Sequence, residues 1–268
     1  GLLADIRRLN ELGDRSIAEP FAGGAGASIS LLYLEETTEI LINDFDKAIH
    51  DIWWSIVHHT SAFLKLLDET QANMCGWRKQ REIYKDRKNR SRIRRGFAAF
   101  YLNRCNRSGI IMNGGPIGGV EQTGEWKLDA RFNKKDLKTR CEKIAEYGER
   151  IQISSQDGIE FISKHDLAST FFFIDPPYFK KGKTLYMNAL GADYHEKLSL
   201  KLKALKNAAW VLTYDDCPEI CELYDSWASV HPFSLRYAAN RRRSGKEVMI
   251  VPKWINLPQS QMSAAIEW

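Results

Sequence analysis

The tetrapeptide Asp175-Pro176-Pro177-Tyr178 follows directly on the apolar run 171–174. A carboxylate at the end of a buried strand, two prolines that stiffen the backbone and an aromatic ring can form a pocket for a flat base with an exocyclic amine. Asp175 can accept a hydrogen bond from that amine, and the carbonyl of Pro176 can accept a second. Tyr178 can stack on the base. The pattern indicates methylation of an amino group.

The same four residues also fit a structural role, in which a strand ends in a Pro-Pro turn and Tyr178 covers the core. An amine inside a duplex is base-paired, so the chemical interpretation requires a nucleotide that has left its stack. Stacking on an aromatic face offsets part of that unstacking cost, which is roughly a few kcal/mol. A second site is needed to decide between the two interpretations.

A glycine-rich segment near the N-terminus supplies that second site. Its sequence is Glu19-Pro20-Phe21-Ala22-Gly23-Gly24-Ala25-Gly26, between a predicted strand and a predicted helix over 28–34. Glycines at such a turn let the backbone approach a ligand closely at a helix N-terminus. A second apolar strand ends in Asp44, at the spacing that binds a ribose through its hydroxyls. The phosphate lysine of a P-loop is missing, so S-adenosylmethionine (AdoMet) fits better than a nucleoside triphosphate.

Four motifs occur in an order that carries a family resemblance. They are the glycine segment 19–26, Asn43-Asp44, Phe100-Tyr101-Leu102-Asn103-Arg104 and the tetrapeptide 175–178. Together they resemble the Dam-like (D12 class) adenine-N6 DNA methyltransferases over about residues 2–251. The resemblance implies an α/β fold, a Rossmann-like AdoMet-dependent methyltransferase sheet with an inserted, mostly helical target-recognition subdomain. It implies methyl transfer to N6 of an adenine flipped out of double-stranded DNA.

The resemblance also assigns roles to individual residues. The catalytic residues are Asp175, Pro176, Pro177 and Tyr178. The glycine turn would hold the methionine part of AdoMet, and Asp44 would bind its ribose. Asp157 matches the acid that lies beside the adenine of AdoMet. The full set expected to bind the cofactor is Glu19, Pro20, Phe21, Ala22, Gly23, Gly24, Gly26, Asp44, Asp157 and Asp175.

The sequence departs from the family pattern in two places. Family members usually carry a Gly-Gly-Lys or Gly-Ser-Lys segment just before their first helix, and it contributes to the cofactor pocket. Here the chain opens at Gly1-Leu2-Leu3-Ala4-Asp5-Ile6, which matches that helix without the preceding loop. The arginine with which Dam reads its target also has no counterpart in the segment after Arg104, so the GATC preference is not carried over.

Positive charge is concentrated between Trp77 and Arg95, where ten Lys and Arg residues face only two acids. Such a density of arginine favours a phosphate-binding face over an ordinary solvated helix surface. Further basic clusters lie at 180–183, directly after the catalytic tetrapeptide, and at 241–246. The residues expected to bind nucleic acid are Arg87, Arg90, Arg94, Arg104, Gln122, Arg131, Lys180 and Lys181.

Short apolar runs predict seven strands in a largely parallel sheet. They cover 16–18, 39–42, 151–154, 170–174, 209–213, 229–234 and 247–251. The gap between the second and third is too long for a simple crossover, so we expect a catalytic domain over 1–53 and 149–268 and an inserted target-recognition subdomain over 54–148. Paired glycines from 109 to 132 predict a hairpin-like segment in which Gln122 and Arg131 read bases in the major groove.

Composition agrees with a DNA-modifying enzyme. The chain has 268 residues, 44% of them hydrophobic, and a net charge of +5. It shows no long apolar stretch, no signal or transit sequence and no zinc-like CxxC pair among five cysteines, so we expect a cytoplasmic protein without a metal. The resemblance places it in a prokaryote or phage, in restriction-modification or phage defence.

Other functions compete with this prediction. The same chemistry could act on RNA. A cytosine amine is disfavoured because the corresponding family usually carries Ser at the position of Asp175. The chain could also be a catalytically weak homologue that serves as a DNA- or protein-binding module.

Overall fold

A computed structural model describes residues 1–179, 190–235 and 245–258. The chain divides into two units. The first, here called the sheet unit, combines Gly1–Phe45 with Ser154–Trp268. The second, the helical unit, is Asp46–Ile153.

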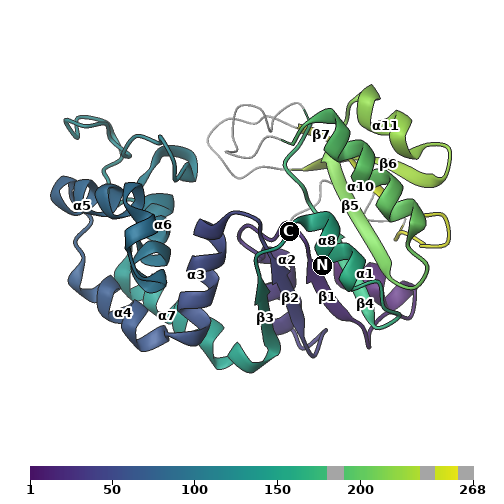
Figure 1. Cartoon of the computed structure of the whole chain (residues 1–268), viewed down its shortest axis with the longest axis horizontal. Coiled ribbons are helices and arrows are strands. Elements are labelled where there is room, and N and C mark those ends of the chain that lie inside the picture. The colour runs from purple at the N-terminus through teal and green to yellow at the C-terminus, as the bar shows by residue number, and fades with distance from the viewer. Residues whose placement is uncertain (180–189, 236–244, 259–268) are drawn as a thin grey trace. The chain divides into compact units, whose positions relative to one another are not determined.

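The described residues form one sheet of seven strands in the order β3-β2-β1-β4-β5-β7-β6 (Figure 1). Strands β1, β2, β4 and β5 pair in parallel, whereas β7 pairs antiparallel with both β5 and β6. All seven predicted strands are present, and the predicted Rossmann-like α/β sheet is confirmed. The strands are β1 (Ser16–Glu19), β2 (Ile40–Asn43), β3 (Ile151–Ser154), β4 (Thr170–Ile174), β5 (Ala209–Asp215), β6 (Ala228–Leu235) and β7 (Gly245–Pro252).

The central strands form because they are continuous apolar runs buried on both faces, as parallel strands between helical layers must be. Every residue of β4 and β5 is buried. Strand order reverses between β1 and β4, and open α/β sheets bind ligands at the carboxyl ends of such neighbouring strands. The helices that accompany the sheet are α1 (Leu2–Leu9), α2 (Gly26–Tyr33), α8 (Gly158–Lys164), α10 (Ala192–Ala204) and α11 (Pro218–Tyr224).

The helical unit is built around its own apolar core. Phe63 and Leu67 of α4 and Phe97 and Tyr101 of α6 are almost fully buried there. A Cβ atom at Gly96 would come within 2.3 Å of the carbonyl oxygen of Asp51, so only glycine lets α6 approach α3 this closely. The elements are α3 (Lys47–His58), α4 (Thr60–Glu69), α5 (Met74–Lys85), η1 (Arg87–Asn89), α6 (Arg92–Cys105), η2 (Arg107–Gly109), α7 (Lys134–Glu146) and η3 (Gly148–Arg150).

The glycine-rich segment from 109 to 132 is not the predicted hairpin. It contains turns and a single isolated bridge between Asn106 and Pro116, but no strand. Gly118 and Gly119 both have positive φ, and a Cβ at Gly118 would lie 2.6 Å from the carbonyl oxygen of Trp126. The glycines therefore fold the segment back on itself in a tight loop instead of terminating a strand pair.

No helix among the described residues has the length and apolar character needed to cross a membrane.

Candidate functional site

The glycine turn links β1 to α2 and leaves open space at its surface. Gly23 has φ +48° and Ala25, the N-cap of α2, has φ 45°. A Cβ built on Gly23, Gly24 or Gly26 would meet no atom within 4 Å. The backbone of this turn is therefore accessible to a ligand, which is the property that a cofactor cradle at a helix N-terminus requires.

Glu19 lies at the end of β1 and is 4% exposed. Its Oε1 accepts the backbone N–H of Ser28 in α2 at 2.7 Å. Burial raises the pKa of this carboxyl to about 7, while hydrogen bonds from Ser28 lower it and the charge of Asp175 adds to the rise. The acid thus anchors the first turn of α2.

Asn43 fastens the ends of three strands together. Its side-chain amide donates to the carbonyl of Pro20 at 2.9 Å, and its Oδ1 accepts from the Ser154 hydroxyl at 2.8 Å. Its backbone carbonyl accepts the N–H of Ala22 at 2.9 Å. The next residue, Asp44, accepts the backbone N–H of Gly23 through Oδ2 at 2.9 Å. The structure therefore brings the glycine turn and the predicted ribose acid together.

Asp157 caps α8 and has a second contact. Its Oδ1 accepts the backbone N–H of Ile159 at 2.9 Å, and its Oδ2 accepts the hydroxyl of Tyr194 at 2.9 Å. Phe21 lies edge-on to Tyr194 with ring centroids 6.4 Å apart. A Cβ on Gly158 would come within 2.4 Å of the Phe21 ring, so the glycine makes room for that ring. Phe21 of the glycine segment thus packs beside the residues that follow β3.

The tetrapeptide 175–178, predicted to be catalytic, begins where β4 ends. Asp175 accepts the hydroxyl of Thr213 through Oδ1 at 2.7 Å, and Tyr178 donates its hydroxyl to Oε2 of Glu247 at 2.9 Å. Pro176 is buried and Pro177 half-buried. The turn from 175 to 178 is consequently attached to the neighbouring strands β5 and β7 at both ends.

Asp175 is exposed as a residue, but protein closely surrounds its carboxyl group. This surrounding burial raises the pKa of its carboxyl to about 6. The hydrogen bond from Thr213 lowers the pKa, and the charge of Glu247 raises it. At neutral pH the group is a carboxylate and can accept a hydrogen bond from an amine.

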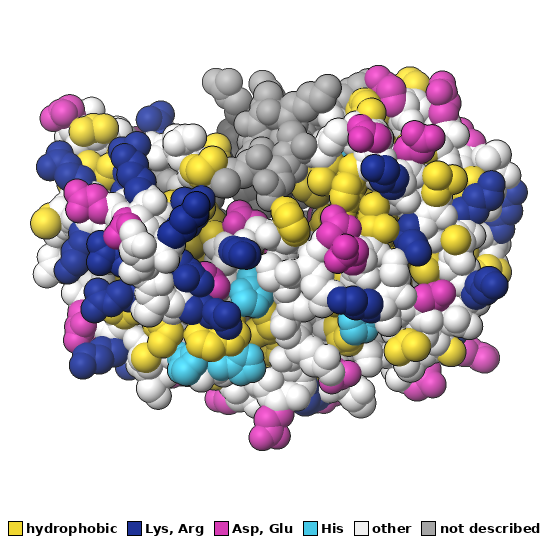
Figure 2. Space-filling model, viewed as in Figure 1, with side chains coloured by type: hydrophobic (Ala, Val, Ile, Leu, Met, Phe, Trp, Pro, Cys, Tyr) yellow, Lys and Arg dark blue, Asp and Glu magenta, His cyan; other side chains and the backbone are white. Residues whose placement is uncertain are grey.

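The predicted phosphate-binding arginines all lie on the helical unit, where Lys and Arg side chains gather over the face shown in Figure 2. Arg87 lies over the Tyr84 ring at 5.1 Å, and Arg90 pairs with Asp86 at 2.8 Å. Arg94 is exposed at the rim of a cavity of about 130 Å³. Two of the three arginines are thus held in place by a neighbouring side chain.

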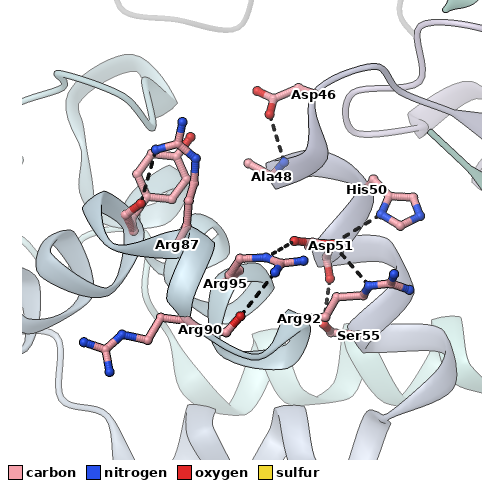
Figure 3. A network of polar contacts seen from close by, with 10 residues as sticks. Asp46, Ala48, His50, Asp51, Ser55, Arg87, Arg90, Arg92 and Arg95 are labelled. Atoms are coloured by element: carbon pink, nitrogen blue, oxygen red, sulfur yellow. Dashed lines mark hydrogen bonds and ion pairs between the residues drawn. The ribbon is translucent and has the colours of Figure 1, made fainter. Parts of the chain in front are cut away.

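Asp51 organises two further arginines (Figure 3). Its carboxylate lies 2.8 Å from Nε of Arg95 and 3.6 Å from Nε of Arg92, and Nδ1 of His50 is 3.3 Å away. Burial acts to raise the pKa of Asp51, but the hydrogen bonds from His50 and Arg95 outweigh it and hold the pKa below its ordinary value. Arg92 in turn stacks over the Trp54 ring at 4.4 Å. The ionised carboxylate therefore fixes two cations on α6.

Three other predicted nucleic-acid residues have contacts inside the helical unit. Gln122 donates to the carbonyls of Ile117 at 2.7 Å and Gly119 at 2.6 Å, and it accepts the N–H of Leu128 at 3.0 Å. Arg131 donates to the carbonyls of Asn103 and Asn106. Arg104 is half-buried, and burial lowers the pKa of its guanidinium. In this structure Gln122 braces its own loop and Arg131 ties that loop to the end of α6, and their reading of bases stays a prediction.

Lys180 and Lys181, the remaining predicted contacts, lie outside the described residues, as do the cations at 241–243. Among the residues that the structure does describe, no group of three or more His, Cys, Asp and Glu side chains could hold a metal ion.

Sequence reasoning missed Thr213, Asp215 and Glu247. Asp215 accepts the backbone N–H of Phe179 at 3.2 Å, so all three side chains contact the catalytic turn. A signal was present, because polar residues interrupt otherwise apolar strands at 213, 215 and 247. A buried polar residue near a strand end is costly without a partner and therefore points to one.

The family model of the D12 class N6 adenine-specific DNA methyltransferases matches residues 2–239. A search of curated proteins found no match. Among solved structures the chain is similar to the rRNA methyltransferase aviRa from Streptomyces viridochromogenes, with a TM-score of 0.35 and 13% identity. That match covers 97% of this chain and 86% of the other.

Proposed function

Because this chain belongs to the D12 class N6 adenine-specific DNA methyltransferase family, we propose that it methylates N6 of an adenine flipped out of double-stranded DNA, with AdoMet as methyl donor. The single observation that carries the assignment beyond the family is the catalytic turn. It presents a carboxylate with a pKa near neutrality, a proline carbonyl and an anchored tyrosine side by side.

The residues around the glycine turn fit the cofactor. The open space over Gly23, Gly24 and Gly26 can take the methionine part, and Asp44 is placed to bind ribose hydroxyls. When bound, AdoMet supplies an electrophilic methyl group on a sulfonium sulfur. Phe21 and the cap of α8 at Asp157 form the side of the pocket that we assign to the cofactor adenine.

The catalytic turn acts on the amine. The carboxylate of Asp175 accepts one N6–H and the carbonyl of Pro176 accepts the other, which directs the nitrogen lone pair toward the methyl group. The nitrogen–carbon bond forms as the sulfur–carbon bond breaks, and the nitrogen then loses one proton. Asp175, which accepts from the amine, can take that proton, and its raised pKa near 6 suits this transfer.

A flipped base needs a surface to replace its lost stacking. We assign this to Tyr178, whose ring is held by the bond between its hydroxyl and Glu247. The arginines of α6 and of the segment before it supply phosphate contacts that position the duplex without reading its sequence.

The experiment is a methyl-transfer assay with labelled AdoMet on duplex DNA and on RNA of matched sequence, followed by analysis of the nucleosides. N6-methyladenine in DNA is the expected product. Asp175→Asn serves as the matched control, since it keeps the size of the side chain and removes its charge. Product in RNA alone, or equal product from the parent and from Asp175→Asn, would contradict the proposal.

A further inference from the structure

Three side chains from two strands hold the catalytic turn. Thr213 and Asp215 of β5 bond to Asp175 and to the backbone of Phe179, and Glu247 of β7 bonds to Tyr178. Asp215 and Glu247 lie directly opposite each other in the antiparallel pairing of the two strands. The turn therefore takes its conformation from residues far away in the sequence.

Glu247 occupies an unfavourable position for an acid. It is 0% exposed, and Asp215, directly opposite, is 6% exposed. Like charges opposite each other destabilise a sheet, and a buried carboxylate costs free energy unless it is hydrogen-bonded. An apolar residue would suit this strand better. The contact that Glu247 makes with the turn accounts for a carboxylate here.

We propose that Glu247 is a positioning residue for methyl transfer, which fixes the Tyr178 ring through its hydroxyl and acts on the Asp175 carboxyl through its charge. This inference rests on the proposed function, because it gives Tyr178 and Asp175 their roles. Glu247 itself does not touch the target amine. Its effect reaches the reaction only through the two turn residues.

The effect on Asp175 has a definite sign. Burial is the largest cause of its raised pKa; the hydroxyl of Thr213 lowers the pKa, the charge of Glu247 raises it, and the hydroxyl of Tyr178 lowers it. Removing the charge of Glu247 therefore lowers the pKa of Asp175, whereas removing the hydroxyl of Thr213 raises it. Among the described residues, the titratable groups that face Asp175 are Glu19 from β1, Tyr178 from the turn, Tyr214 from β5 and Glu247 from β7.

The first test is a carbon-13 NMR titration of the aspartate carboxyls in the free protein, with the Asp175 signal assigned from Asp175→Asn. Glu247→Gln is expected to move the midpoint of Asp175 to lower pH, because glutamine keeps an acceptor for Tyr178 and removes the charge. Thr213→Val, the control with the opposite sign, is expected to move it to higher pH. A midpoint in Glu247→Gln equal to that of the parent would overturn the electrostatic part of the proposal.

The second test concerns the tyrosine. Glu247→Leu and Tyr178→Phe each break the same hydrogen bond, and each is expected to slow single-turnover methyl transfer about tenfold, within the range for a hydrogen bond to a charged group. The double variant is expected to lose less activity than the product of the two single losses, because the shared hydrogen bond can be lost only once, with AdoMet affinity unchanged throughout. Additive losses would show that Glu247 does not act through Tyr178. Thermal unfolding of each variant verifies that it is folded.

The two tests separate this inference from the proposed function. The titration is performed without cofactor or DNA, so it reports on the coupling of Glu247 and Asp175 even if the parent methylates no adenine. An inactive parent contradicts the proposed function. An active parent in which neither Glu247 variant differs from it contradicts the role of Glu247.

Discussion

The backbone N–H of Gly23 donates to Oδ2 of Asp44 at 2.9 Å, and this bond ties the glycine turn after β1 to the acid after β2. The carboxylate thus has two tasks in the proposed site, because it holds the turn that receives the methionine part of AdoMet and contacts the ribose. A substitution at 44 acts on both.

We therefore expect Asp44→Ala to raise the dissociation constant for AdoMet about tenfold to a hundredfold, roughly the value of one hydrogen bond to a charged group. Asp44→Asn keeps an acceptor for the Gly23 N–H and should weaken binding less. Isothermal titration with AdoMet measures both constants. An Asp44→Ala protein that binds AdoMet as the parent does would remove the ribose assignment.

Asp175→Asn is expected to slow methyl transfer about 10²–10⁴-fold while AdoMet binding is largely retained, since we propose that the carboxylate acts on the target amine. In the parent, kcat/KM should fall as pH drops through about 6, because protonated Asp175 no longer accepts from the amine. Rates on duplex DNA between pH 5 and 8 measure this limb. Equal loss of AdoMet binding in the variant would show that the pocket is misassigned.

Replacing Arg87, Arg90 and Arg94 together by glutamine should weaken binding to all duplexes alike and lower the salt slope by up to about three, near one unit per lost phosphate contact. The matched control replaces Lys135, Lys138 and Arg140 of α7, which changes the net charge equally elsewhere on the helical unit. Binding curves at several salt concentrations give both slopes. The same slope in the two triple variants would assign the effect to net charge and not to a phosphate-binding face.

Glu19 predicts a stability that depends on pH. Its pKa is about 7 in the folded protein against an ordinary value of 4.5, so the unfolded chain loses the proton first and stability falls as pH rises between these values. Glu19→Gln keeps an acceptor for Ser28 and should be more stable than the parent at pH 8, by on the order of 3 kcal/mol, and similar to it at pH 4.5. Denaturant unfolding at the two values of pH measures the difference. A difference that is the same at both would contradict the buried carboxylate.

The variant Gln122→Ala distinguishes two roles for Gln122, which are holding the conformation of its loop and reading a base. Its three bonds to the loop backbone predict that the variant binds all DNA sequences less well, because the loop loses its conformation. A reader would instead relax the preference at one base pair, by roughly 1–3 kcal/mol. Methylation maps from cells that express the parent, Gln122→Ala or Arg131→Lys measure the change. A map that changes at a single position would support the base-reading role.

The sheet could be predicted from the sequence because its strands are short apolar runs whose burial is a local property. The apolar run at 170–174 favours a strand by its own composition. The positions of Asp44 and Asp175 could be predicted because each acid lies directly after such a strand. The loop at 109–132 could not be predicted, since paired glycines fit both a hairpin and a folded loop. The bonds that select the loop come from Gln122 and Lys127, which pair with backbone carbonyls of the loop itself.

The contacts of the turn at 175–178 could not be predicted from the sequence for a different reason. Glu247 and Tyr178 are 69 positions apart, and only the antiparallel placement of β7 beside β5 brings them together. Parallel strands are easily recognised by their apolar runs, but their neighbours are fixed by the whole topology. Residues that act through such pairings can therefore be identified only once the order of the strands in the sheet is known.

The hydrogen bonds that join Asn43 and Asp44 to Ser154 bear on how much the inserted segment can vary. The chain leaves the sheet unit after Phe45 and returns to it at Ser154. Two hydrogen bonds join the chain at these two places. The Ser154 hydroxyl donates to Oδ1 of Asn43, and the N–H of Asp44 donates to the Ser154 carbonyl at 3.3 Å. The entropy of closing a loop grows only with the logarithm of its length, by about 0.6 kcal/mol for each doubling. Because the sheet unit itself holds the two ends of the inserted segment together, that segment can lengthen or shorten at little thermodynamic cost.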